Sequence, residues 1–260
     1  MKKQIILASY KTIDTSFLHN EYCKDIPHVI YDKTDLNNYK NKILNSDATI
    51  DDLVYSHGNV VHLPNLGLAS HVHLYHIVKN YDNLADIMIF IAGDNLGDRF
   101  SGRTNTEAFE TIRDTEPDSC PDFINLSGVW GNYPLRGECY RFLNERFAHH
   151  WESLFHEKIP TKFSPAIDTT FLTSKIAIQR QPLDFYEKAL ELIGENCYKK
   201  DYWKMKYEGE VVSVMAPSKK NLQKFPHKSP KHFDFPACAF FEHSFQRIFD
   251  MDFYKRINIR

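Results

Sequence analysis

The chain has 260 residues, of which 42% are hydrophobic and 25% are charged, and this composition is that of an ordinary globular protein. Its formal net charge of −2 argues against a general nucleic-acid-binding protein, because such proteins usually carry a basic excess. The five cysteines are scattered without a CxxC pair, which excludes a disulfide framework or a cysteine zinc site and indicates a reduced, cytoplasmic protein.

Short apolar segments alternate with connections in the first part of the chain and predict strands at residues 4–8, 28–31 and 60–63. The chain is then organised around residues 61–98, where a turn with Pro, Asn and Gly precedes a helix predicted over 69–80 and a strand predicted over 87–92. An uninterrupted apolar run of this length is typical of a strand buried on both faces of a parallel sheet. This order predicts an α/β fold with a mostly parallel central sheet flanked by helices.

The rest of the chain predicts further helices around that sheet. Residues 99–134 are rich in turn residues, which indicates either an active-site flap or a short helix near 107–113 with ordinary loops around it. Helical spacing predicts helices over 140–156, from 181 onward and over 239–249, and we also expect a strand over 170–178 and an exposed connection over 209–236. We therefore expect one domain over 1–260 with a C-terminal helical elaboration.

Acidic residues directly follow the strand predicted at 87–92, where Asp94 and Asp98 lie next to glycines. Ligands of open α/β sheets bind beyond the carboxyl ends of the strands, and hard cations such as Mg²⁺ prefer oxygen ligands. Asp94 and Asp98 are therefore candidate ligands of Mn²⁺ or Mg²⁺, although a turn that needs Asp and Gly for backbone reasons also explains them. Ser9, Tyr10 and Lys11 end the first predicted strand and are candidates for contacts to a base and to phosphate, or form an ordinary strand end.

Three histidines lie on the predicted helix over 69–80, and His73 and His76, three residues apart, share a face of it. A zinc site needs a third protein ligand, and no motif of the HExxH kind is present. We therefore interpret the three as structural and retain only His71, at the edge of the apolar stripe, as a candidate binding residue.

Late in the chain, Glu242 and Asp168 are competing candidates for a general base, and His243 is a candidate metal ligand. A general base must lie within hydrogen-bond reach of the proton that it removes. Helix capping or surface charge is the alternative role for each carboxylate.

The central region carries three motifs that are found together in a known family: Pro64-Asn65-Leu66-Gly67, Asn80-Tyr81-Asp82-Asn83-Leu84 and Phe90-Ile91-Ala92-Gly93. On these motifs the chain resembles an uncharacterised family of bacterial and fungal proteins, which in turn is distantly similar to GT-A glycosyltransferases. The resemblance implies a GT-A-like (Rossmann-like) fold with a nucleotide-binding half at 1–98 and an acceptor half at 99–260, in which Asn65 and Gly67 shape the donor pocket. Two departures concern the site: Leu68-Ala69 stands where the resemblance leads us to expect Arg-Glu, and Gly93-Asp94-Asn95 is not an Asp-x-Asp motif.

The leading hypothesis is a metal-dependent glycosyltransferase that moves a sugar from a nucleotide-sugar donor to a glycan acceptor, in bacterial surface polysaccharide synthesis. The alternatives are a metal-dependent hydrolase that uses the region of His71, His73 and His76, and a non-catalytic glycan-binding module. Peripheral membrane contact also stays open, because lysines are concentrated late in the chain, although a solvated surface is the preferred interpretation. These lysines are Lys199, Lys200, Lys204, Lys206, Lys219 and Lys220.

Overall fold

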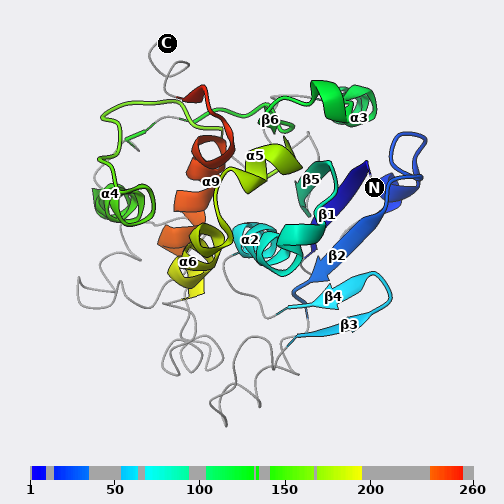
Figure 1. Cartoon of the computed structure of the whole chain (residues 1–260), viewed down its shortest axis with the longest axis horizontal. Helices are drawn as coiled ribbons and strands as arrows, with labels where there is room; N and C mark the ends of the chain where they lie inside the picture. Colours follow the sequence, from blue (N-terminus) through cyan, green and yellow to red (C-terminus); the bar gives the residue numbers. More distant parts are fainter. Residues whose placement is uncertain are drawn as a thin grey trace, which may run out of the picture.

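The computed structural model of the protein describes residues 2–9, 15–34, 54–63, 68–93, 104–131, 133–134, 141–166, 169–194 and 235–253. For residues 68, 141–143, 146, 194, 235–239, 242 and 243 it describes the backbone only. Within these residues a sheet lies between two groups of helices (Figure 1).

Among the described residues, seven strands form one sheet in the order β3-β4-β2-β1-β5-β7-β6. The strands are β1 (Lys3–Ser9), β2 (His28–Asp32), β3 (Tyr55–His57), β4 (Val60–His62), β5 (Ile87–Ala92), β6 (Ile124–Asn125) and β7 (Phe171–Ser174). Strands β4, β2, β1 and β5 are parallel, whereas β3 pairs antiparallel with β4, and β7 pairs antiparallel with both β5 and β6. The predicted α/β fold is thus confirmed as a mixed sheet with a parallel core.

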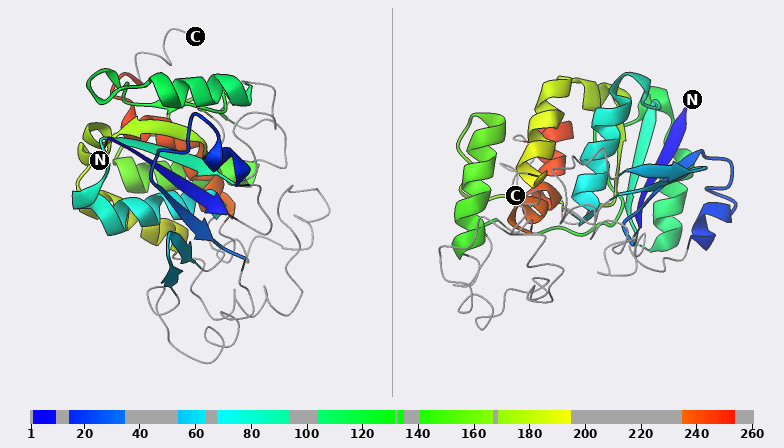
Figure 2. Two further views of the ribbon diagram at one scale, coloured as in Figure 1. Left: turned by 90° about the vertical axis from the view of Figure 1, so that its right-hand side faces the viewer. Right: turned by 90° about the horizontal axis from the view of Figure 1, so that it is seen from below.

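Helices cover both faces of this sheet, which explains why β1 and β5 are almost uniformly apolar. The helices are η1 (Ser16–His19), α2 (Leu68–Asn80), η3 (Tyr81–Asn83), α3 (Asn105–Asp114), η4 (Pro117–Ser119), α4 (Arg141–Phe155), α5 (Lys175–Gln179), α6 (Leu183–Gly194) and α9 (Phe235–Phe249). Ile6 and Phe90 belong to the core shared with α2, α4, α6 and α9, while Ile5 and Ile89 belong to the core shared with η1 and α3. Figure 2 shows the sheet between these two layers.

Helix α2 is buried on nearly all sides, because it packs on the sheet and is itself covered by α6 and α9. Residues 70–77 are at most 6% exposed. The sequence predicted an apolar stripe on one side of this helix, whereas the helix is buried on nearly all sides. Its three histidines therefore all lie in the protein interior.

Helix α9 begins at Phe235, so it includes the last two residues of the connection expected over 209–236 and starts four residues before the helix expected over 239–249. Three further differences from the sequence prediction concern strands. The strand expected over 170–178 ends at Ser174, because the Ser174 side chain accepts a hydrogen bond from the Ala177 amide and caps α5. Strand β3, which pairs with β4 beyond a turn with Gly58 at φ +62°, was not predicted. The two-residue strand β6 was not predicted either, since such a short segment carries no readable periodicity.

The short helix expected near residues 107–113 is present as α3. Of the two interpretations of residues 99–134, the one that includes this helix is confirmed as far as the helix is concerned. Thr104 and Glu107 form a capping box, in which each side chain accepts a hydrogen bond from the backbone amide of the other residue. In the part of the chain that the structure describes, no helix is both long and apolar enough to cross a membrane.

Candidate functional site

The candidate site lies at the carboxyl edge of the parallel core, where the order of the strands reverses. The chain passes from β1 outward to β2 and β4 and then returns to place β5 on the other side of β1. Open α/β sheets bind ligands at such a switch point, outside the carboxyl ends of the strands. Here the switch point lies between the end of β1 at Ser9 and the end of β5 at Ala92.

Two polar residues are buried beside this switch point. The Lys33 amide donates a hydrogen bond of 3.0 Å to the Ser9 carbonyl, which extends the pairing of β2 with β1 by one residue. Ser9 and Lys33 are both buried, and only 2% of Lys33 is exposed. Lysine is rarely buried to this extent, so Lys33 places a charged side chain in the interior at this edge.

His71 lies in the first turn of α2, at the same edge, and is fully buried. Neither of its ring nitrogens has a hydrogen-bond partner among the described residues, and its ring lies 6.0 Å from that of Tyr75. Burial, together with the charge of Lys33, holds the pKa of His71 well below its usual value. At neutral pH the imidazole is therefore uncharged and carries one unused donor and one unused acceptor.

His73 and His76 have structural partners, in agreement with the structural interpretation. His73 Nε2 donates to the Thr169 carbonyl at 2.7 Å, and the ring lies 4.9 Å from Phe90. His76 Nδ1 is hydrogen-bonded to the Tyr31 hydroxyl at 2.9 Å. Burial lowers the pKa of His73 to about 3 and that of His76 to about 4. The described residues hold no group of three His, Cys, Asp or Glu side chains suited to a metal, so the zinc alternative gains no support from them.

A carboxylate and two stacked rings lie at the ends of β2 and β4. Asp32 Oδ2 lies 3.4 Å from His62 Nδ1, while Asp32 Oδ1 accepts a hydrogen bond from the Thr34 amide. The Tyr55 ring stacks on the His62 ring, with centroids 4.3 Å apart and planes 13° from parallel, and is 37% exposed. These residues were not predicted from the sequence, although the position of Asp32 directly after a predicted strand is a signal that could have identified it.

On the β7 side of β5, this edge of the sheet holds polar groups that are hydrogen-bonded within the protein. The Thr170 hydroxyl accepts a hydrogen bond from the Ala92 amide at 3.2 Å, and the Asn125 side-chain amide donates to the Val129 carbonyl at 2.7 Å. Trp130 follows and forms a β-bridge with Ala166. Since the indole is 42% exposed, it offers a flat apolar surface next to the edge.

Of the residues predicted to form the site, the structure brings Ser9 and His71 to this edge. Glu242 and His243 lie in α9, and only the backbone of these two residues is described. The remaining predicted residues lie outside the described residues: Tyr10, Lys11, Asn65, Gly67, Asp94, Asp98 and Asp168.

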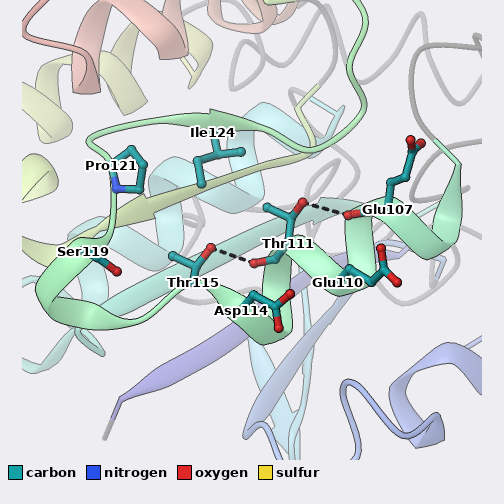
Figure 3. A pocket seen from close by; sticks show the side chains of 8 residues that line it. All are labelled: Glu107, Glu110, Thr111, Asp114, Thr115, Ser119, Pro121 and Ile124. Atoms are coloured by element: carbon teal, nitrogen blue, oxygen red, sulfur yellow. Dashed lines mark hydrogen bonds between the residues drawn. The ribbon is translucent and has the colours of Figure 1, made fainter.

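An open groove of about 550 Å³ runs along α3, and its lining is shown in Figure 3. Its polar groups already have structural roles: the Thr111 hydroxyl donates to the Glu107 carbonyl, and the Thr115 hydroxyl donates to the Thr111 carbonyl. Glu107 belongs to the capping box, and Asp114 is paired with Arg113 at 2.6 Å. These contacts explain four of the polar lining residues without a ligand, and the carboxyl edge of the parallel core remains the stronger candidate.

The fold and this edge define an α/β protein with an open, mixed sheet and a parallel core. The chain belongs to the family described as "Protein of unknown function (DUF3431)", which matches residues 5–215. No match was found among curated proteins or among solved structures. The prediction of an uncharacterised family is confirmed, whereas these comparisons do not link the chain to GT-A glycosyltransferases.

Proposed function

We propose that the protein is a glycosyltransferase that moves a sugar from a nucleotide-sugar donor to a glycan acceptor at the carboxyl edge of its sheet. The observation that carries this proposal is the switch point between β1 and β5, with buried polar residues beside it. Nucleotides bind at the switch points of other open α/β sheets. The parallel core β4-β2-β1-β5 also provides the kind of sheet that a GT-A-like domain requires.

The nucleoside of the donor would bind beside β2 and β4. Tyr55 and His62 present a stacked pair of rings, and base–aromatic stacking is a general way to hold a base. Asp32 ends β2, and an acidic residue that follows the first βα unit often binds the ribose hydroxyls in dinucleotide-binding folds. In this proposal, Asp32 accepts hydrogen bonds from the ribose and Tyr55 supports the base.

Mn²⁺ or Mg²⁺ remains part of the proposal, with Asp94, Asp98 and His243 as ligands. A divalent ion would neutralise charge on the leaving diphosphate. The described side chains offer no group of three suitable ligands, so the metal rests on the positions of these three residues in the sequence alone.

The glycan acceptor would bind toward β6, where Trp130 exposes its indole. Aromatic faces suit sugar rings, because they bury the apolar side of the ring while its hydroxyls stay in water. Glu242 and Asp168 stay the competing proposals for the base that activates the acceptor hydroxyl. Synthesis of a bacterial surface polysaccharide in the cytoplasm, with peripheral membrane contact through the late lysines, is the proposed setting.

A thermal-shift screen of nucleotide-sugars with and without Mn²⁺ tests the proposal. We expect one nucleotide-sugar to stabilise the wild type in a Mn²⁺-dependent way, since a ligand at 100 times its Kd adds about 2.7 kcal/mol. Asp94→Ala should remove the Mn²⁺ dependence, and Asp32→Asn should weaken binding. Asp86→Asn is the control, because Asp86 is exposed and precedes β5 at the opposite edge of the sheet. Absence of any nucleotide-sugar effect, or an equal effect in Asp94→Ala, would contradict the proposal.

A non-catalytic glycan-binding module is the second candidate. The exposed Trp130 is compatible with glycan binding alone, and Leu68-Ala69 replaces the Arg-Glu pair that the resemblance leads us to expect. Glycan binding that depends on Trp130, without affinity for any nucleotide-sugar, would favour this candidate over the transferase.

A further inference from the structure

We infer that a row of four side chains across the carboxyl edge of the sheet binds a nucleotide lengthwise and selects ribonucleotides over 2′-deoxyribonucleotides. The row consists of Ser9, Asp32, His62 and Tyr55. This inference rests on the proposed function and deepens it, because it adds the class of nucleotide and the direction in which the nucleotide lies.

The strand register places the four residues side by side. Ser9 on β1 pairs with Asp32 on β2, and Asp32 pairs with His62 on β4. His62 in turn pairs with Tyr55 on β3. Neighbouring strands lie about 4.8 Å apart, so the row spans about 14 Å from β1 to β3. Two contacts show that its outer members share one face: Asp32 approaches His62 to 3.4 Å, and the His62 and Tyr55 rings stack at 4.3 Å.

The inner end of the row lies on the same face. Leu7 and Ile30 both pack into the core shared with η1 and α3. Side chains alternate along a strand, so Ser9 and Asp32, each two residues farther on, point to that face as well. Ser9 ends β1 beside the switch point. The row therefore leads from the switch point to the outer edge of the sheet at β3 (Figure 1).

The Asp32 carboxylate is placed to receive hydrogen bonds from a ligand. Its Oδ1 accepts from the Thr34 amide at 2.9 Å, its Oδ2 lies 3.4 Å from His62 Nδ1, and the side chain is 24% exposed. Within the described part of the chain no lysine or arginine forms a salt bridge with Asp32. An ionised carboxylate accepts at both oxygens, and a ribose offers two adjacent hydroxyls, one for each. A 2′-deoxyribose lacks one of them and leaves an acceptor unmatched.

A nucleotide carries its groups in the same order as the row. With the ribose at Asp32, the phosphates lie toward Ser9 and the switch point, and the base lies toward His62 and Tyr55. The His62 side chain is 20% exposed and Tyr55 is 37% exposed, so the ring pair is accessible to an aromatic base. The reverse direction would bring the charged diphosphate onto the rings and the base to the polar end of the row. The chemistry of the row therefore favours one direction.

Titration calorimetry with UDP, GDP, ADP and CDP, each beside its 2′-deoxy counterpart, in Mn²⁺ and in EDTA, tests the inference. We expect the ribonucleotide that binds best to bind about tenfold or more tightly than its deoxy counterpart, because a hydrogen bond to a charged group is lost. Asp32→Asn should reduce this ratio to less than about threefold. The asparagine keeps an oxygen that can accept from the Thr34 amide, so the turn after β2 stays intact.

Two further variants separate selectivity from affinity. Tyr55→Ala should weaken a ribonucleotide and its deoxy counterpart by the same factor, about fivefold or more, because the ring lies two strands away from Asp32. Asp86→Asn removes the same charge at the opposite edge of the sheet and should change neither affinity by more than about twofold. A purely structural role of Asp32 would change both affinities together and leave their ratio intact.

The inference and the proposed function can fail separately. Equal binding of the two series by the wild type, or a ratio that Asp32→Asn leaves unchanged, would overturn the inference and leave the transferase proposal in place. Ribonucleotide selectivity that requires Asp32, without Mn²⁺-dependent binding of any nucleotide-sugar, would support the inference and contradict the transferase. No binding of any nucleotide of either series would overturn both.

Discussion

Acidification should destabilise this protein before its carboxylates begin to be protonated, because buried neutral histidines cannot accept protons without unfolding. Burial lowers the folded-state pKa of His73 to about 3 and that of His76 to about 4, whereas an unfolded histidine titrates near about 6.5. The unfolded state therefore binds more protons as the pH falls below about 6.5, and the stability present above that pH is progressively lost.

The size of this effect follows from the two pKa values. Each histidine removes roughly 1.4 kcal/mol per pH unit once the pH is below its unfolded pKa. Together, His73 and His76 remove roughly 4 kcal/mol between pH 7 and pH 5, which is a large fraction of the stability of a typical domain. His71, whose pKa is also lowered by burial, adds to the loss in the same direction.

Urea denaturation at a series of pH values from 7.5 to 5 measures the loss, and His73→Gln isolates one contribution. The glutamine amide can still donate to the Thr169 carbonyl but does not titrate, so this variant should lose about 2 kcal/mol less than the wild type between pH 7 and pH 5. His57→Gln is the control, because His57 is exposed on β3. A wild-type stability that stays constant down to pH 5, or an equal loss in His73→Gln, would refute the reasoning.

Three further predictions concern the core, a helix cap and the edge of the sheet. Phe90→Ala removes a fully buried ring that contacts His73, and it should lower the free energy of unfolding by about 3–5 kcal/mol in urea denaturation; a loss below about 1 kcal/mol would mean that the core is loosely packed. Thr104→Ala breaks the capping box with Glu107 and should cost about 1 kcal/mol, with faster amide exchange confined to α3; exchange that is faster throughout the protein would contradict a local role. Trp130→Ala should change stability by less than about 1 kcal/mol, because Trp130 is 42% exposed, but should weaken glycan binding in affinity electrophoresis; unchanged glycan mobility would remove Trp130 from the acceptor site.

The parallel core could be predicted because its strands carry their own signal. Residues 87–92 form an uninterrupted apolar run, and a strand covered by helices on both faces needs this composition. The boundary at Ser174 was missed because apolar residues continue into α5, and only the side-chain cap separates the strand from the helix. Local composition therefore identifies the strand but not where it ends.

The candidate site was only partly predictable, for a different reason. Ser9 was selected because it ends a recognisable strand, whereas the contact between Asp32 and His62 depends on the pairing of β2 with β4, which no local pattern encodes. His71 was retained as a residue at the edge of an apolar stripe. The lack of a hydrogen-bond partner for its ring among the described residues depends on the tertiary packing, in which α6 and α9 cover α2, and cannot be inferred from the sequence.

The antiparallel pairing of β5 with β7 has a consequence for synthesis on the ribosome. β5 is complete at Ala92, but its outer neighbour begins only at Phe171, so a nascent chain of intermediate length carries a hydrophobic strand without its partner. Unpaired strand edges readily associate with other chains. Translation arrest or truncation before Phe171 should therefore yield aggregates, and a chaperone that binds extended apolar segments would find its target in β5.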